Sequence, residues 1–191
     1  MKTTAKRLES VQEYYFSRKL REVGQMIQAG HPIINMGIGS PDIAPHPNVV
    51  LALQKALEHP KAHMYQSYQG LPELREAIAT FYRNYYQVSL NPDSEILPLM
   101  GSKEGIMHIS LAFLNPGDEV LIPNPGYPTY ESVSRLAEAS PIFYDLKETN
   151  QWQPEFEALE ALDTRRIKIM WLNYPHMPTG TPINIETFDR L

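Results

Sequence analysis

The feature that most constrains this chain of 191 residues is an alternation of candidate strands and helices that begins at about residue 94. The candidate strands cover residues 95–100, 119–122, 142–146 and 167–173, and the candidate helices between them cover 102–114, 128–139 and 154–162. Such alternation favours a largely parallel sheet covered by helices. We therefore predict an α/β fold for this part of the chain.

The residues before this region predict helices and one long loop. An interrupted apolar stripe favours a helix from Lys6 to Ala29, which Gly30 and Pro32 end. Residues 33–47 hold too many glycines and prolines for regular structure. Further helices are predicted for residues 48–58 and 72–86, and the start of another for 184–191.

Charge and composition exclude several classes of protein. The chain has 17 Lys and Arg against 22 Asp and Glu, a net charge of -5, and no long basic run that would neutralise a nucleic-acid backbone. It has no cysteine, which excludes disulfides and thiolate metal sites. The N-terminus is charged where a signal peptide needs an apolar stretch, and no apolar run has membrane-spanning length. We expect a cytoplasmic protein with no nucleic-acid or membrane partner.

One pair of histidines has the spacing of metal ligands on a helix. His59 and His63 stand four positions apart, but Pro60 between them breaks a helix. We therefore interpret them as loop residues and predict no metal site.

Residues 100–105, Met-Gly-Ser-Lys-Glu-Gly, stand where a candidate strand ends and a helix begins. The N–H groups at the start of a helix, together with the helix dipole, favour an anion such as a phosphate there. Gly101 lets the backbone approach closely, Ser102 caps the helix or offers its hydroxyl, and Lys103 adds a positive charge. An ordinary capped helix after a strand explains the same residues, so this segment alone leaves both interpretations open.

Two further loops follow candidate strands. In residues 124–130 the turn presents Tyr127 at the carboxyl edge of the sheet, where open α/β sheets bind ligands. The ring would stack on a flat cofactor or pack beneath its own loop, and the segment alone does not decide between them. Residues 173–180, Asn-Tyr-Pro-His-Met-Pro-Thr-Gly, are by themselves only a proline-rich turn.

The order and spacing of the segments are more specific than any one of them. In chain order they are MGIGSPD at 36–42, Tyr65 five residues before Gly70, LPELREAI at 71–78, GSKEG at 101–105, LNPGDEV at 114–120, PGYP at 125–128 and PTG at 178–180. This series resembles the class I and II aminotransferases, which are pyridoxal-phosphate enzymes of fold type I. The resemblance runs from about residue 30 to the last residue and corresponds to the N-terminal half of such an enzyme.

The resemblance implies an N-terminal segment plus part of the large domain of a fold type I enzyme. Residues 1–47 would form an N-terminal helix and a substrate-side loop, and residues 48–191 an incomplete domain that binds pyridoxal 5'-phosphate. The implied activity moves an amino group between an amino acid and a 2-oxo acid. A lyase of the same fold and a non-catalytic module that binds or senses the cofactor are alternatives, because a fold does not fix a reaction.

The resemblance also implies roles for individual residues. Tyr127 would stack on the pyridine ring, and Gly39 would lie near the α-carboxylate of the substrate. Tyr65 would reach the phosphate held by the neighbouring subunit, which implies a homodimer. The cradle for the phosphate would be formed by the backbone of Gly101, Ser102 and Lys103.

Two departures from the family pattern matter. The family has an asparagine before Pro178 whose amide contacts the phenolic oxygen of the cofactor, whereas this chain has Met177 at that position in the cofactor site, and a thioether donates no hydrogen bond. Either His176 or a group outside this chain would then supply the donor, or the phenolic oxygen would lose that contact. The lysine that forms the Schiff base lies beyond Leu191 in the family, so we expect no catalytic residue in this chain and no activity from it alone.

Overall fold

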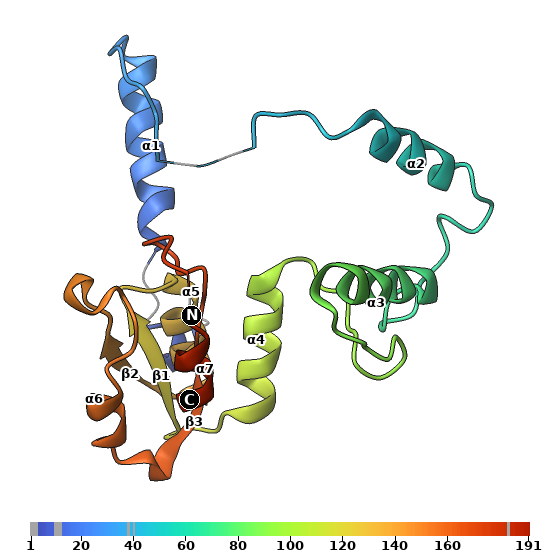
Figure 1. The fold of residues 1–191 in the computed structure, drawn as a ribbon. Coiled ribbons are helices and arrows are strands. Elements are labelled where there is room, and N and C mark those ends of the chain that lie inside the picture. The colour runs from blue at the N-terminus through green and yellow to red at the C-terminus, as the bar shows by residue number, and fades with distance from the viewer. Residues whose placement is uncertain (1–3, 10–12, 38, 40, 183) are drawn as a thin grey trace. The chain divides into compact units, whose positions relative to one another are not determined.

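The computed structural model describes residues 4–9, 13–37, 39, 41–182 and 184–191 (Figure 1). The chain forms two compact units. We call Met1–Gln12 together with Met100–Leu191 the sheet unit, and Glu13–Leu99 the helical unit. The sequence-based division at residue 47 is not the boundary between these units and stays a prediction about domains.

The sheet unit is built on three parallel strands, β1 (Glu119–Asn124), β2 (Ser140–Asp145) and β3 (Ile167–Met170). The middle strand is β1, in which Glu119 pairs with Ser140 of β2 and with Ile167 of β3. The α/β fold with a parallel sheet is therefore confirmed.

The strand predicted at residues 95–100 is wrong. Its first residue closes a turn instead, because the Asn91 amide donates to Glu95 Oε2 at 2.7 Å and the Glu95 amide donates to Asn91 O at 2.9 Å. Pro98 in the middle of the segment has no N–H to offer to a neighbouring strand. Among the described residues the segment therefore pairs with no strand.

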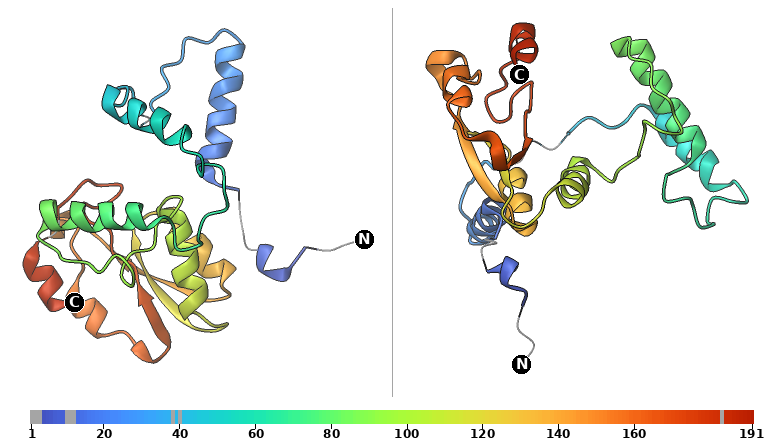
Figure 2. Two further views of the ribbon diagram at one scale, coloured as in Figure 1. Left: turned by 90° about the vertical axis from the view of Figure 1, so that its right-hand side faces the viewer. Right: turned by 90° about the horizontal axis from the view of Figure 1, so that it is seen from below.

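Helices cover both faces of the sheet because side chains alternate along the middle strand. Val120 and Ile122 of β1 pack in one core cluster with residues of α4 (Ser102–Phe113) and α5 (Pro128–Leu136). Leu121 packs in a second cluster with Leu159 of α6 (Phe156–Glu160). The two clusters place α5 and α6 on opposite faces of the sheet (Figure 2).

Short helices complete the sheet unit, namely η1 (Lys6–Leu8), η2 (Glu148–Asn150), η3 (Thr164–Arg166) and α7 (Ile185–Arg190). The predicted helices at 102–114, 128–139, 154–162 and 184–191 are confirmed with shifted ends. The helix α6 begins at Phe156, later than predicted, because the buried Pro154 pairs with Leu146 in an extended bridge.

The helical unit contains α1 (Tyr15–Gln28), α2 (Pro47–Leu57) and α3 (Pro72–Tyr86). Pro47 and Pro72 occupy the first turns of their helices, where the missing N–H is not needed. The single helix predicted from Lys6 to Ala29 is wrong at its start, because α1 begins only after Tyr14, whose ψ of 121° is not helical. Residues 10–12 within that prediction lie outside the described part of the chain.

The helical unit buries almost nothing by itself. Among its described residues only Arg75 is buried, and none of its large hydrophobic side chains is. The guanidinium of Arg75 ties α3 to the loops on either side, donating from Nη1 to Gly70 O at 2.7 Å and from Nε to Pro92 O at 2.8 Å. Polar contacts around one arginine therefore hold the loops that flank α3.

No described helix is both long and apolar enough to cross a membrane. In the same residues, no three or more His, Cys, Asp or Glu side chains gather as they would around a metal ion. The loop interpretation of His59 and His63 is confirmed, because α2 ends at Leu57 and His59 Nδ1 accepts from the Lys61 amide at 3.2 Å.

Candidate functional site

The start of α4 is an exposed helix end shaped by backbone. Gly101 precedes it with φ 103° and ψ 162°, a conformation that favours glycine, and no side chain caps the first turn. Ser102 and Lys103 follow, and both are exposed. The helix dipole and the amides of this turn therefore meet at one accessible point, which suits a phosphoryl group.

The carboxylate of the same turn is engaged elsewhere. Glu104 Oε2 accepts from the Met100 amide at 2.5 Å, and Oε1 lies 3.4 Å from His108 Nε2. The Met100 amide holds the pKa of the Glu104 carboxyl below its usual value, with a smaller contribution from His108. The Glu104 carboxylate thus fixes the backbone at Met100, directly before α4.

Tyr127 lies beside the same helix end. Lys103 Nζ stands over its ring, 5.8 Å from the ring centroid. The half-buried Tyr127 ring also meets the Tyr130 ring edge-on, with ring centroids 5.7 Å apart. Tyr130 in turn stacks on Trp171, with ring centroids 5.0 Å apart. Two of the sequence motifs, 24 positions apart at Lys103 and Tyr127, are therefore brought to one place.

The turn that carries Tyr127 has only one residue type that fits at its tip. A Cβ placed on Gly126 would lie 2.2 Å from Pro123 O and 2.9 Å from Pro123 Cγ. Because a backbone oxygen cannot give way as a flexible side chain does, glycine is required there. The tight turn delivers Tyr127 to the carboxyl end of β1, directly before the first turn of α5.

The loop after β3 brings Met177 to the same edge of the sheet. The Met177 amide donates to Asn173 Oδ1 at 3.0 Å, while the His176 amide donates to Thr181 O at 2.7 Å. The Met177 side chain is 46% exposed, so its thioether is presented at the surface of the loop. The side chain at position 177 therefore donates no hydrogen bond.

His176 is buried between this loop and the Tyr127 turn. Its ring is only 2% exposed, with Nδ1 2.8 Å from Thr179 Oγ1 and Nε2 3.1 Å from Pro125 O. A carbonyl only accepts, so Nε2 carries the proton and Nδ1 accepts from the Thr179 hydroxyl. Burial lowers the pKa of the imidazole, although the Pro125 carbonyl acts in the opposite sense. Both ring nitrogens are committed, so His176 does not supply the donor that Met177 lacks.

The structure thus groups five of the seven sequence-predicted site residues in the sheet unit, at Gly101, Ser102, Lys103, Tyr127 and Met177. The other two, Gly39 and Tyr65, belong to the helical unit, and both are exposed. Their roles stay predictions. Sequence reasoning missed the aromatic support of Tyr127 by Tyr130 and Trp171, because no local pattern links these rings.

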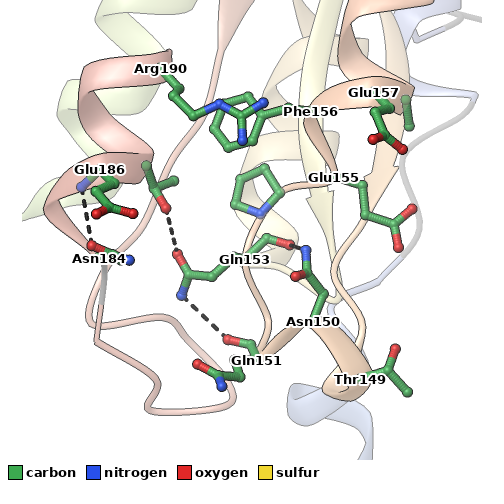
Figure 3. Close-up of a pocket in the computed structure, with 13 residues that line it drawn as sticks. Thr149, Asn150, Gln151, Gln153, Glu155, Phe156, Glu157, Asn184, Glu186 and Arg190 are labelled. Carbon is green, nitrogen blue, oxygen red and sulfur yellow. Dashed lines mark hydrogen bonds between the residues drawn. The ribbon is translucent and has the colours of Figure 1, made fainter.

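A hollow of about 980 Å³ lies elsewhere in the sheet unit, between η2, α6 and α7 (Figure 3). Its polar groups largely bond to one another, with Gln153 joined to Thr187 Oγ1 and to Gln151 O. Arg190 lies 3.8 Å from the ring centroid of Phe156. None of the predicted site residues lines this hollow, so it is separate from the candidate site.

Comparison with known proteins gives the family. Residues 31–191 match the family model of aminotransferases of class I and II. The LL-diaminopimelate aminotransferase of Aquifex aeolicus is 40% identical over 185 residues, which are 97% of this chain and 48% of that enzyme. This chain therefore spans about half the length of the relatives that it matches.

Solved structures agree. BacF of Bacillus subtilis in its apo form superposes with a TM-score of 0.91 at 37% identity, over 98% of this chain and 48% of that one. An alanine aminotransferase of Pyrococcus furiosus gives a TM-score of 0.89 at 29% identity, again over 98% and 48%. The fold is that of the N-terminal half of fold type I aminotransferases. By its matched family model, its sequence and its fold, this chain belongs to the class I and II aminotransferases.

Proposed function

We propose that the chain is the phosphate-anchoring half of an aminotransferase that moves an amino group between an amino acid and a 2-oxo acid. Pyridoxal 5'-phosphate is the cofactor of this family. The observation that carries the proposal is the position of Lys103 Nζ over the Tyr127 ring at the start of α4, because it joins an anion-binding helix end to an aromatic surface.

The residues present fit this cofactor. The amides of Ser102 and Lys103 bind the phosphate, and the ammonium of Lys103 adds charge to the same spot. The ring of Tyr127 stacks on the pyridine and keeps water from one face. When bound, the cofactor supplies an electron sink for the bonds at the α-carbon of the substrate. Gly39 contacts the α-carboxylate of that substrate through its backbone.

Neither alternative from the sequence is favoured. The relatives named above are aminotransferases by name, so a lyase or a non-catalytic sensor gains no support from them. Fold alone does not separate these possibilities, and the names of the relatives support the aminotransferase. Assayed by itself, the chain is expected to give no turnover that depends on an amino donor, because none of its lysines matches the family's Schiff-base position.

The complete enzyme is a homodimer in which Tyr65 contacts the phosphate held by the neighbouring subunit. The ring of Tyr65 is fully exposed, as is suitable for a residue that reaches another chain. The apolar side chains of α2, such as Leu53 at 63% exposure, also need a surface to cover them. Sedimentation velocity of the complete enzyme is expected to show a dimer that dissociates on dilution. A monomer at every concentration would contradict this.

Binding of pyridoxamine 5'-phosphate tests the proposed site. This form of the cofactor has no aldehyde, so it forms no Schiff base with surface lysines and reports only the non-covalent site. We expect it to quench the tryptophan emission, because Trp171 stacks on Tyr130 and Tyr130 contacts Tyr127. We also expect it to bind about tenfold or more tightly than pyridoxamine without the phosphate. Equal affinity for the two compounds would overturn the phosphate site.

Matched variants locate that binding. Lys103→Met and Tyr127→Ala are each expected to weaken binding about tenfold, since each removes a charge-assisted or stacking contact. The controls are Lys55→Met on α2 and Tyr68→Ala in an exposed loop, which leave the affinity unchanged. An equal loss in the controls and the site variants would show that the ligand binds elsewhere.

A further inference from the structure

One buried imidazole connects two segments of the site that are 51 positions apart in sequence. His176 lies in the loop after β3, and its Nε2 donates to Pro125 O in the turn after β1 at 3.1 Å. Its Nδ1 accepts from Thr179 Oγ1 at 2.8 Å within its own loop. The ring is 2% exposed, so it reaches neither solvent nor a ligand directly.

The loop side of this connection is itself braced. Thr179 Oγ1 lies 3.1 Å from Thr181 Oγ1 and accepts from the Thr181 amide at 3.4 Å. The Gly180 amide closes the loop by donating to His176 O. A hydroxyl carries one proton, so with the Thr179 proton on His176 Nδ1 the bond between the two hydroxyls runs from Thr181 to Thr179.

The turn side has little freedom to absorb a change. Pro125 lies two positions before Tyr127, and the carbonyl that His176 holds belongs to the peptide that leads into Gly126. Gly126 has no room for even a Cβ against Pro123 O, so this turn has one tight shape. A shift at the Pro125 carbonyl therefore passes to Tyr127.

We propose that His176 is a positioning residue, which sets the ring of Tyr127 against the start of α4 through its bond to the Pro125 carbonyl. It touches neither cofactor nor substrate. The inference rests on the proposed function for its meaning, but the position of the Tyr127 ring is a property of the free chain and is measured without ligand. If His176 only filled space, the position of the Tyr127 ring would not depend on which of the two imidazole hydrogen bonds is kept.

Two substitutions separate the two bonds. His176→Gln places an amide nitrogen near the position of Nε2 and keeps a donor for Pro125 O, whereas His176→Asn places its amide near Nδ1 and keeps only the Thr179 partner. Both replace the ring with a smaller polar amide, so each controls for the loss of packing in the other. We expect the Gln variant to bind pyridoxamine 5'-phosphate within about threefold of the unmodified chain, and the Asn variant about tenfold more weakly.

The free chain gives a second measurement. Fluorotyrosine is incorporated, and the fluorine resonance of Tyr127 is assigned by its loss in Tyr127→Phe. We expect His176→Asn to move or broaden this resonance and His176→Gln to leave it in place, at similar melting temperatures. Should the two variants shift the resonance equally, or should affinity simply follow melting temperature, the positioning role is refuted and His176 is a packing residue.

The two measurements distinguish failure of the proposed function from failure of the positioning role. If the unmodified chain shows no preference for the phosphorylated ligand while the resonance still separates Gln from Asn, the proposed function fails and the positioning role stands. If the His176 variants do not fold, Thr179→Val decides with Thr179→Ser as its control. We then expect only the Val variant to displace the Tyr127 resonance, because a buried Nδ1 without a donor no longer fixes the tautomer that holds Nε2 on Pro125 O, whereas the Gln side chain has no such unpaired nitrogen. No displacement in either variant would overturn the proposal.

Discussion

Tyr130 stacks flat on Trp171, with ring centroids 5.0 Å apart and an interplanar angle of 9°, and meets Tyr127 edge-on. Tyr130 is buried, so it supports both the core and the ring at the site. We expect Tyr130→Leu to lower the free energy of unfolding by about 1 to 2 kcal/mol through loss of the aromatic pair and imperfect filling. Urea unfolding monitored by tryptophan emission measures this, and Tyr68→Leu, at an exposed position, is the neutral control.

Gly126 gives a sharper test of the turn. In Gly126→Ala the added methyl meets Pro123 O at 2.2 Å, so the turn must open and Tyr127 must move. We expect a loss of roughly 1 to 3 kcal/mol in the free energy of unfolding, as for other overpacked sites, together with weaker ligand binding. Gly24→Ala in α1 is the matched control, because its methyl meets nothing within 4 Å and alanine favours a helix. A Gly126→Ala chain as stable as the control variant would contradict the tight turn.

Three of the four predicted strands form, because the alternation of strands and helices can be read from short segments and favours a parallel sheet. Val120, Leu121 and Ile122 form a continuous apolar run, as strands buried on both faces do, and this run became the middle strand. The segment at 95–100 had a similar composition but failed, because the Asn91–Glu95 turn and Pro98 outweigh its preference for a strand.

The candidate site was predictable only in part. The loop at Tyr127 was identified because it follows a strand, at the edge where open parallel sheets bind ligands. The helix start at Ser102 was identified correctly, although the strand predicted directly before it does not form. The bond from His176 to Pro125 was not, because no local pattern reports a partner 51 positions away. The roles proposed for Gly39 and Tyr65 would depend on contacts with other surfaces, which a single chain's pattern does not encode.

Arg75 is expected to control the local stability of the helical unit. Arg75→Met leaves the carbonyls of Gly70 and Pro92 without their donor, and Arg75→Lys cannot restore the planar set of N–H groups that reaches both. We expect each variant to raise amide exchange at Gly70 by about tenfold or more, since that amide closes the adjoining turn onto Ser67 O. Arg83→Met, on the exposed part of α3, is the control, and equal exchange in all variants would show that Arg75 does not hold these loops.

Met177 is expected to limit binding rather than support it. The Met177→Asn variant places an amide donor in a loop whose backbone is already fixed through Asn173 Oδ1 and the bonds of His176. With that loop pre-organised, one new hydrogen bond should tighten pyridoxamine 5'-phosphate binding by about three- to tenfold. Met64→Asn in the helical unit controls for general effects of the substitution. Unchanged or weaker binding in Met177→Asn would place this side chain away from the ligand.

The buried imidazole of His176 also predicts how stability responds to acid. Burial depresses its pKa in the folded chain below the ordinary value of 6.5, so folding favours the neutral ring. Its contribution is complete above pH 6.5 and is lost as the pH falls through the depressed folded value, because the unfolded chain then binds a proton that the folded chain resists. His176→Gln has no such group, so the stability advantage of the unmodified chain over this variant should shrink between about pH 7 and pH 5. Urea unfolding of both chains at a series of pH values measures the difference. An advantage that stays constant or grows on acidification would mean that the ring of His176 is charged, or reaches solvent, in the folded chain.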